Sequence, residues 1–154
     1  MAAKKKSTGA SVSPDAQLKS LIGKFDAKEQ TLIRAVRSAL RKRLPTTNEL
    51  IYDYGSFFVV GYSPSENGIE SVVSFAARPD GLRLYFLNGP KLADPKKLLL
   101  GSASQVRYIP LEAASRVKHP DVEALIAAAI AKSKVRLPAK GGGKLITKTS
   151  KSAK

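Results

Sequence analysis

The chain has 154 residues, a formal net charge of +15, one histidine and no cysteine. These counts exclude disulfides, cysteine nucleophiles and metal sites built from thiolates or several histidines. No apolar run is long enough to span a bilayer, and the start MAAKKKSTGASVSPD lacks the apolar core of a secretory signal. We therefore expect a soluble, cytoplasmic protein with one folded domain and no membrane partner.

The positive charge is concentrated outside the middle of the chain. Residues 45–131 hold eight basic and nine acidic residues, whereas residues 132–154 hold eight basic and no acidic ones. Composition predicts a disordered basic tail over residues 1–14, a domain over residues 15–134, and a disordered basic Gly/Lys-rich tail over residues 135–154. Basic arms on a nearly neutral domain are typical of proteins that bind polyanions such as nucleic acid.

Two helices are predicted near the start of the chain. Ser13 suits an N-cap with Pro14 in the first turn, and Gly23 ends this helix. Asp26 suits a second N-cap, followed by a helix that stops at about Leu44.

The second of these helices carries two stripes at helical spacing. The apolar stripe consists of Leu32, Ile33, Val36, Leu40 and Leu44. The neighbouring stripe consists of Arg34, Arg37 and Arg41. We expect the apolar stripe to pack on a sheet and the arginines to form a cationic ridge in solvent.

After the second predicted helix, the apolar residues no longer follow helical spacing, which indicates strands. The stretch IYDYGSFFVVGYSP, residues 51–64, predicts mainly one central strand, with the wall of a shallow pocket as a second role. Two alternating runs, residues 69–77 and 82–87, flank Arg78-Pro79-Asp80-Gly81 and predict a β-hairpin.

The second half of the chain completes the predicted fold. Residues 96–100 suit a short helix capped by Asp94, residues 105–109 a fourth strand, and the residues from Pro120 onward a last helix. The sequence thus predicts an α+β fold, in which an antiparallel sheet of about four strands packs against N-terminal and C-terminal helices.

Three segments carry a resemblance to a known family. They are LIYDYGSFFVVGYSP, VVSFAARPDGLRLYFLNGPKLADPKKLLLGSASQVRYIPLE and HPDVEALIAAAIA. From about Leu18 to Ala131 the chain resembles the YdhG-like family, bacterial domains of unassigned function. The most specific marks are Tyr52-Asp53-Tyr54, the strand LYFL with Asn88-Gly89, and the segment from Leu98 that leads into Val106-Arg107. The resemblance implies an antiparallel sheet with helices at both chain ends.

One branch of that family is linked to iron handling, because its fold is similar to that of frataxin. Such proteins use acidic side chains on the first helix, since iron ions prefer carboxylate oxygens. Here the matching helix has Asp26 and Glu29 against Arg34, Arg37, Arg41, Lys42 and Arg43. Repulsion between like charges opposes cation binding, so an iron chaperone is the least favoured interpretation, and we predict no metal and no cofactor.

Two groups of residues suit a cleft for a small anionic ligand. Tyr52, Asp53 and Tyr54 would form its rim, although rings packed at a strand start are the favoured explanation. The second group consists of Lys96, Lys97, Gly101, Ser102, Ser104 and Arg107. Its small residues would let backbone N–H groups approach a phosphate, and its cations would supply positive charge. A solvated turn is favoured there too, because no phosphate-loop motif is present. His119 suits a surface or capping role at a helix start better than general-base catalysis.

The favoured function is that of a non-catalytic domain whose basic tails bind nucleic acid or another polyanion weakly and without sequence preference. The residues expected to contact the polyanion are Arg34, Arg37, Arg41, Lys134, Arg136, Lys140, Lys144, Lys148 and Lys151. The tails hold no aromatic residue, so no base stacking is expected from them, and solubility is the competing explanation of their charge. The alternative function is a module for a small anionic metabolite, or an enzyme of unassigned class, that uses the cleft between Tyr52 and Arg107.

Overall fold

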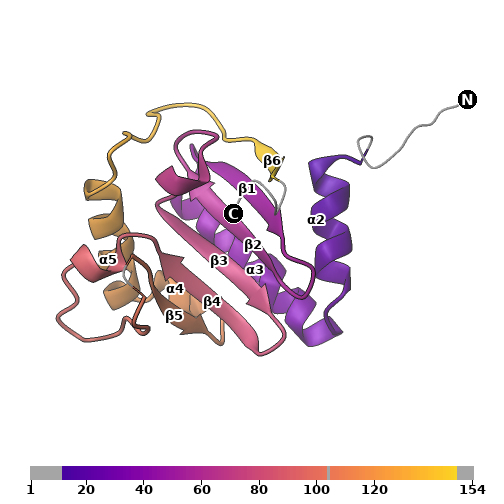
Figure 1. Ribbon diagram of the computed structural model, residues 1–154, viewed down its shortest axis with the longest axis horizontal. Coiled ribbons are helices and arrows are strands. Elements are labelled where there is room, and N and C mark those ends of the chain that lie inside the picture. The colour runs from indigo at the N-terminus through magenta and orange to yellow at the C-terminus, as the bar shows by residue number, and fades with distance from the viewer. Residues whose placement is uncertain (1–11, 104, 149–154) are drawn as a thin grey trace, which may run out of the picture.

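The computed structural model describes residues 12–103 and 105–148. A six-stranded sheet in the order β5-β4-β3-β2-β1-β6 carries the longer helices on one face (Figure 1). The α-helices are α2 (Pro14–Gly23), α3 (Ala27–Arg43), α4 (Ser115–Lys118) and α5 (Pro120–Ala131), and the 3-10 helices are η2 (Gly68–Glu70) and η3 (Gly89–Lys91). The strands are β1 (Asn48–Asp53), β2 (Phe58–Ser63), β3 (Val73–Arg78), β4 (Gly81–Phe86), β5 (Arg107–Leu111) and β6 (Leu145–Lys148).

Side-chain caps begin both N-terminal helices where the sequence predicts them. The Ser13 Oγ accepts a hydrogen bond from the Ala16 N–H at 3.1 Å, and Asp26 Oδ1 accepts one from the Glu29 N–H at 2.8 Å. These caps satisfy N–H groups that have no partner within the helix. The apolar stripe of α3 is buried as expected, with Ile33 and Val36 fully inaccessible.

The α+β class is confirmed, and the predicted sheet of about four antiparallel strands agrees only roughly with the six strands found, of which β6 pairs parallel with β1. The stretch from residue 51 to 64 forms parts of two strands, because the chain reverses direction between Asp53 and Phe58. Gly55 has a φ of 86°, and its N–H donates to Asp53 Oδ1 at 2.9 Å. An aspartate that bonds two residues ahead and a glycine at positive φ make a turn, which the surrounding apolar run conceals in the sequence.

The predicted hairpin around Pro79 and Asp80 is confirmed. β3 and β4 pair antiparallel, with Arg78 opposite Gly81, and Gly81 has a φ of 127°. The predicted helix at residues 96–100 is wrong: these residues form a loop, and Leu100 makes an isolated bridge with Tyr108. Proline at 95 and the Asp94 side chain favour a turn over a longer helix there.

The last strand, β6, lies in the segment predicted to be a disordered tail, so that prediction is wrong for residues 145–148. β6 pairs parallel with β1, the Glu49 N–H donates to the Lys144 carbonyl at 2.8 Å, and Thr147 Oγ1 bonds Gln17 Oε1 at 2.7 Å. The physical reason is that β1 would otherwise be an edge strand with unpaired backbone groups. The remaining parts of the predicted tails, residues 1–11 and 149–154, lie outside the described residues.

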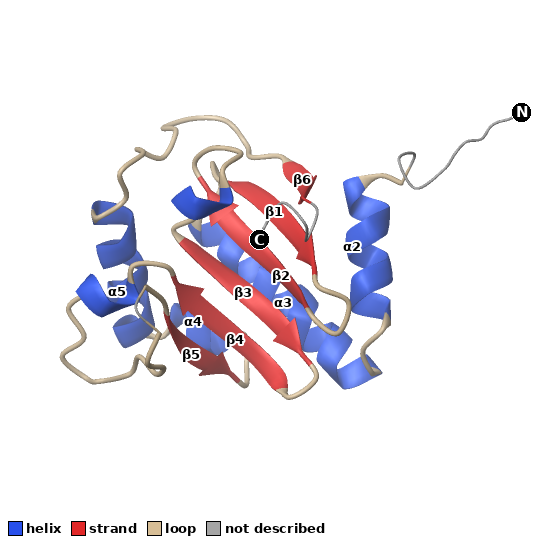
Figure 2. Ribbon diagram, viewed as in Figure 1, coloured by secondary structure: helices blue, strands red, loops and turns tan. Residues whose placement is uncertain are grey.

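The two faces of the sheet differ in what covers them. In β4, Leu82, Leu84 and Phe86 are buried against the helices, and Arg83 and Tyr85 alternate with them on the other face. Figure 2 shows α3 behind the strands and no α-helix in front of them. We call the face without an α-helix among the described residues the open face.

Gly143 controls the docking of β6. A Cβ at Gly143 would overlap the carbonyl oxygen of Thr47, whereas a Cβ at Gly142 would meet open space. We expect Gly143→Ala to separate β6 from β1 and to raise the hydrogen-exchange rate of the Glu49 amide about tenfold or more, because that N–H then loses its acceptor. Amide exchange followed by NMR measures this rate.

Gly142→Ala is the matched control and should leave the exchange rate of Glu49 unchanged. Equal Glu49 exchange in the two variants would contradict the role given to Gly143.

Candidate functional site

The cleft predicted between Tyr52 and Arg107 is not formed. Tyr52 and Asp53 lie at the end of β1 with Tyr54 directly after it, whereas Arg107 lies in β5, on the far side of β2, β3 and β4. Four strand spacings of about 4.8 Å place these two groups about 19 Å apart. The sequence could not show this separation, because it does not state the order of the strands in the sheet.

In the loop before β5, the donors best suited to bind an anion already donate hydrogen bonds to acceptors within the protein. The Asp94 carboxylate accepts hydrogen bonds from the N–H groups of Leu98 and Leu99, both at 2.9 Å. The Arg107 guanidinium donates to the carbonyl groups of Ala103 and Val106. Lys96, Lys97, Gly101 and Ser102 are exposed around this loop, and Ser104 lies outside the described residues. An external phosphate would have to displace an internal carboxylate.

His119 caps α5. Its Nδ1 accepts a hydrogen bond from the Asp121 N–H at 3.1 Å. The expected capping role is confirmed.

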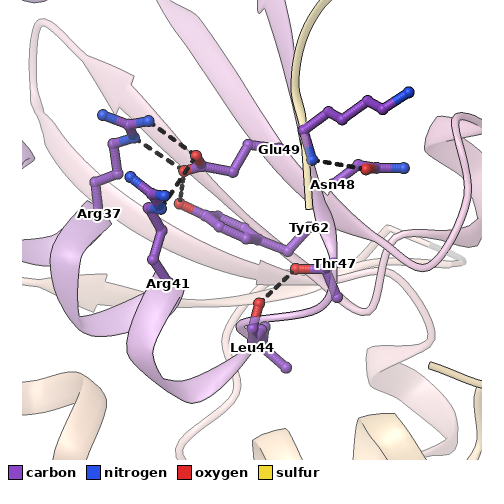
Figure 3. A network of polar contacts seen from close by, with 8 residues as sticks. Arg37, Arg41, Leu44, Thr47, Asn48, Glu49 and Tyr62 are labelled. Carbon is purple, nitrogen blue, oxygen red and sulfur yellow. Dashed lines mark hydrogen bonds and ion pairs between the residues drawn. The ribbon is translucent and has the colours of Figure 1, made fainter. Parts of the chain in front are cut away.

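A carboxylate that the sequence did not single out, Glu49, is held beneath α3 (Figure 3). Its side chain is 7% exposed, and its two oxygens accept hydrogen bonds from Arg37 Nε and Nη2, both at 2.9 Å. The Tyr62 hydroxyl donates to Glu49 Oε2 at 2.8 Å, and Arg41 Nε lies 3.6 Å from Oε1. A bidentate pair of this kind fixes both the position and the orientation of the guanidinium group.

The environment of this network shifts the proton affinities of its members. The hydrogen bond to Glu49 raises the pKa of Arg37, against an opposing effect of burial. Burial raises the pKa of Tyr62 well above its ordinary value, and the negative charge of Glu49 raises it further. The sequence holds one signal for this network: Glu49 has the same strand parity as the buried Ile51, so it must face the helices.

A groove of about 680 Å³ lies between α2 and α3, and we call it the α2–α3 groove. The charged residues that line it are Lys19, Arg34, Arg37, Arg41, Lys42 and Asp15. The structure therefore brings the three predicted arginines of α3 together in one concave surface. The expectation of a ridge entirely in solvent is wrong for Arg37, because Glu49 draws its side chain toward β1.

The other predicted cations are distributed along the last part of the chain. Lys134, Arg136 and Lys140 follow α5, whereas Lys144 and Lys148 lie beside β1. The Lys148 Nζ donates to the Glu66 carbonyl at 2.9 Å. The bond between Gln17 of α2 and Thr147 of β6 places this edge next to one wall of the α2–α3 groove. Lys151 lies outside the described residues.

No family model, no curated protein and no solved structure matches this chain. The resemblance to the YdhG-like family therefore stays a prediction. Within residues 12–103 and 105–148, no group of three or more Asp, Glu or His side chains could hold a metal ion. In the same ranges, no helix has the length and apolar character needed to cross a membrane.

The contacts of Glu49 predict that removal of its charge lowers the stability of the protein. Glu49→Gln keeps the shape of the side chain but leaves Arg37, which is 22% exposed, without its counter-charge. We expect the free energy of unfolding to fall by about 1.5–3 kcal/mol, the range for hydrogen bonds to charged groups. Urea denaturation at neutral pH measures the change.

Glu123→Gln provides the control, because it breaks the more exposed pair between Arg43 and Glu123. This variant should lose less than about 1 kcal/mol. A loss as large as that of Glu49→Gln would argue against a special role for the Glu49 network.

The raised pKa of Tyr62 predicts how the stability of the protein changes at alkaline pH. In the unfolded chain this phenol titrates at about 10. Above that pH the unfolded state has lost a proton that the folded state keeps, so the free energy of unfolding falls, by at most about 1.4 kcal/mol per pH unit. We therefore expect the stability advantage of the natural protein over Tyr62→Phe to shrink as pH rises above about 10. Urea denaturation of both proteins across this range measures it, and a constant difference would contradict it.

Proposed function

We propose that the protein is a non-catalytic binding module for polyanions, with nucleic acid as the foremost ligand, and that the α2–α3 groove is its principal site. The observation that carries this proposal is the charge of the groove. Five cationic side chains line it, against Asp15 on its rim and Glu49 beneath it. The excess of three positive charges in one concave surface attracts and concentrates phosphate groups.

The cations of the groove differ in exposure. Arg37 is held by Glu49 and is 22% exposed, whereas Arg41 is 59% exposed, and Lys19, Arg34 and Lys42 are exposed as well. The exposed groups can follow the spacing of successive phosphates. None of the aromatic residues lines the groove. Such a surface supports binding by counterion release, without reading of the base sequence.

The C-terminal edge of the sheet lies beside this surface. Thr147 of β6 bonds Gln17 of α2, whereas the neighbouring Lys148 points to the other face and donates to the Glu66 carbonyl. Residues 149–154, which include Lys151, continue the chain from that edge. In this proposal the C-terminal cations act together with the α2–α3 groove.

A small anionic metabolite is the second candidate ligand, and the size of the groove favours it. A volume of about 680 Å³ lies within the range of about 300–1,000 Å³ found for small-molecule sites. Chain length separates the two candidates. Binding that strengthens from tripolyphosphate to long polyphosphate supports a polymer ligand, and equal binding supports a small one.

The test of the proposed function is a triple variant, Lys19→Gln, Arg34→Gln and Lys42→Gln. We expect the slope of log affinity against log salt concentration to become shallower by about 2–3 for a duplex of about 20 base pairs, because each lost phosphate contact removes about 0.9. Fluorescence anisotropy with a labelled duplex of random sequence at several salt concentrations measures the slope.

The matched control is Lys91→Gln, Lys96→Gln and Lys118→Gln, which removes the same charge from exposed positions outside the α2–α3 groove. The control should keep most of the affinity and of the salt slope. Identical losses in the two triple variants would show that net charge matters and the groove does not.

A further inference from the structure

Three aromatic rings stack at one end of the open face. The rings of Tyr52 and Tyr54 lie 6.4 Å apart and those of Tyr54 and Phe57 lie 4.9 Å apart, in both cases with an interplanar angle of 16°. The Arg78 guanidinium continues the series, 5.2 Å from the centre of the Phe57 ring. The tight turn at Gly55 places these rings side by side.

A second group lies across the same face on β4 and β5. The rings of Tyr85 and Tyr108 lie 5.5 Å apart, and the Arg83 guanidinium lies 4.3 Å from the centre of the Tyr108 ring. Arg83 Nη1 also donates to the Tyr85 hydroxyl at 3.2 Å. This hydrogen bond raises the pKa of Arg83, which stays charged at any physiological pH.

Asp80 joins the two groups. Its Oδ1 accepts a hydrogen bond from Arg78 Nε at 3.1 Å, and its Oδ2 lies 3.6 Å from Arg83 Nη2. The bond from Arg78 lowers the pKa of Asp80. The result is a continuous series of rings and guanidinium groups from Tyr52 to Tyr108, which we call the belt.

The centre of the open face is covered between the two groups. Gly61, Ser74 and Ala76 are buried there, and the Ser71 side chain lies over Gly61. The side chains of the belt are mostly half-buried, and Tyr54 is 40% exposed. The rings are therefore held in fixed positions but remain accessible from solvent.

We propose that the belt binds the unpaired bases of a single-stranded nucleic acid. Planar rings interleaved with guanidinium groups are the surface on which successive bases stack, whatever their sequence. A chain with a net charge of +15 attracts the phosphates that accompany those bases. A double helix hides the faces of its bases, so a duplex gains nothing from the belt.

The belt is separate from the α2–α3 groove, and its proposal does not rest on the proposed function. The groove lies between two helices that cover one face of the sheet, whereas the belt lies on the other face. The two surfaces also differ in chemistry, because the groove offers charge without rings and the belt offers rings with two arginines. They can therefore be tested separately in the full chain.

The test uses Tyr54→Ala in the full chain. The probe is an oligodeoxythymidylate of about 12 nucleotides with one central 2-aminopurine, whose fluorescence is quenched when the base stacks. We expect quenching with the natural protein, about tenfold weaker binding of this probe by Tyr54→Ala, and no change in duplex binding. Tyr54→Phe, which keeps the ring, should bind like the natural protein.

Two further variants separate stacking from charge and from general hydrophobicity. Arg83→Lys keeps the charge but loses the flat guanidinium group, so it should also weaken single-strand binding by about fivefold or more. Ile69→Ala removes a side chain that is 84% exposed and lies outside the belt, and it should have no effect.

The proposal would be overturned by the absence of quenching, by single-strand binding of Tyr54→Ala and Arg83→Lys that equals that of the natural protein, or by an equal loss of binding in Ile69→Ala. If duplex affinity depends on Lys19, Arg34 and Lys42 but the belt variants bind single strands normally, the proposal for the α2–α3 groove is supported and the proposal for the belt is contradicted. Binding of a protein partner that requires Tyr54, without any single-strand binding, would also contradict the proposal for the belt.

Discussion

The placement of one carboxylate under α3 organises the cationic side of the molecule. Glu49 cannot lie in the interior without a partner, because the cost of removing its charge from water is large. Arg37 meets that requirement through two hydrogen bonds, and Tyr62 adds a third. These contacts fix α3 against β1 and β2 at the point where α2, β6 and the α2–α3 groove meet. The position of the groove thus depends on a charge pair in the sheet beneath it.

The same sheet separates two kinds of surface. Strand alternation sends Glu49 and Tyr62 toward the helices, and it sends Tyr52, Arg83 and Tyr85 toward the open face. A shift of one residue in any strand would exchange these sets. The fold therefore keeps Arg37 and Arg41 of α3, which face Glu49, apart from Arg78 and Arg83 of the belt, which face aromatic rings and Asp80.

Local chemistry made part of this structure predictable from the sequence. The N-caps at Ser13 and Asp26, the turn at Pro79 and Asp80, and the capping role of His119 each depend on residues within a few positions of one another. Long-range pairing was not predictable. Arg37 and Glu49 are 12 positions apart in different elements, and no feature of either segment in the sequence identifies the other as its partner.

The candidate sites also differ in whether they follow from local sequence or depend on long-range pairing. The three arginines of α3 share a helix face, so their grouping in the α2–α3 groove followed from their spacing. The belt combines residues from β1 to β5, and it exists only because the strand order brings Phe57 to Arg78 and Arg83 to Tyr108. The predicted ligand cleft failed for the same reason, since it assumed that two distant strands were neighbours.

The pairing of β6 with β1 has a consequence for the order of folding during synthesis. The hydrogen bond between Lys144 and Asn48 closes a loop of 96 positions, by far longer than the turns that join β1 to β2 or β3 to β4. A growing chain can complete five strands and α5 before residue 144 leaves the ribosome. Until then the backbone of β1 is an open edge, to which any extended segment nearby can bind. Residues 145–148 therefore close the sheet only after its other five strands have been translated.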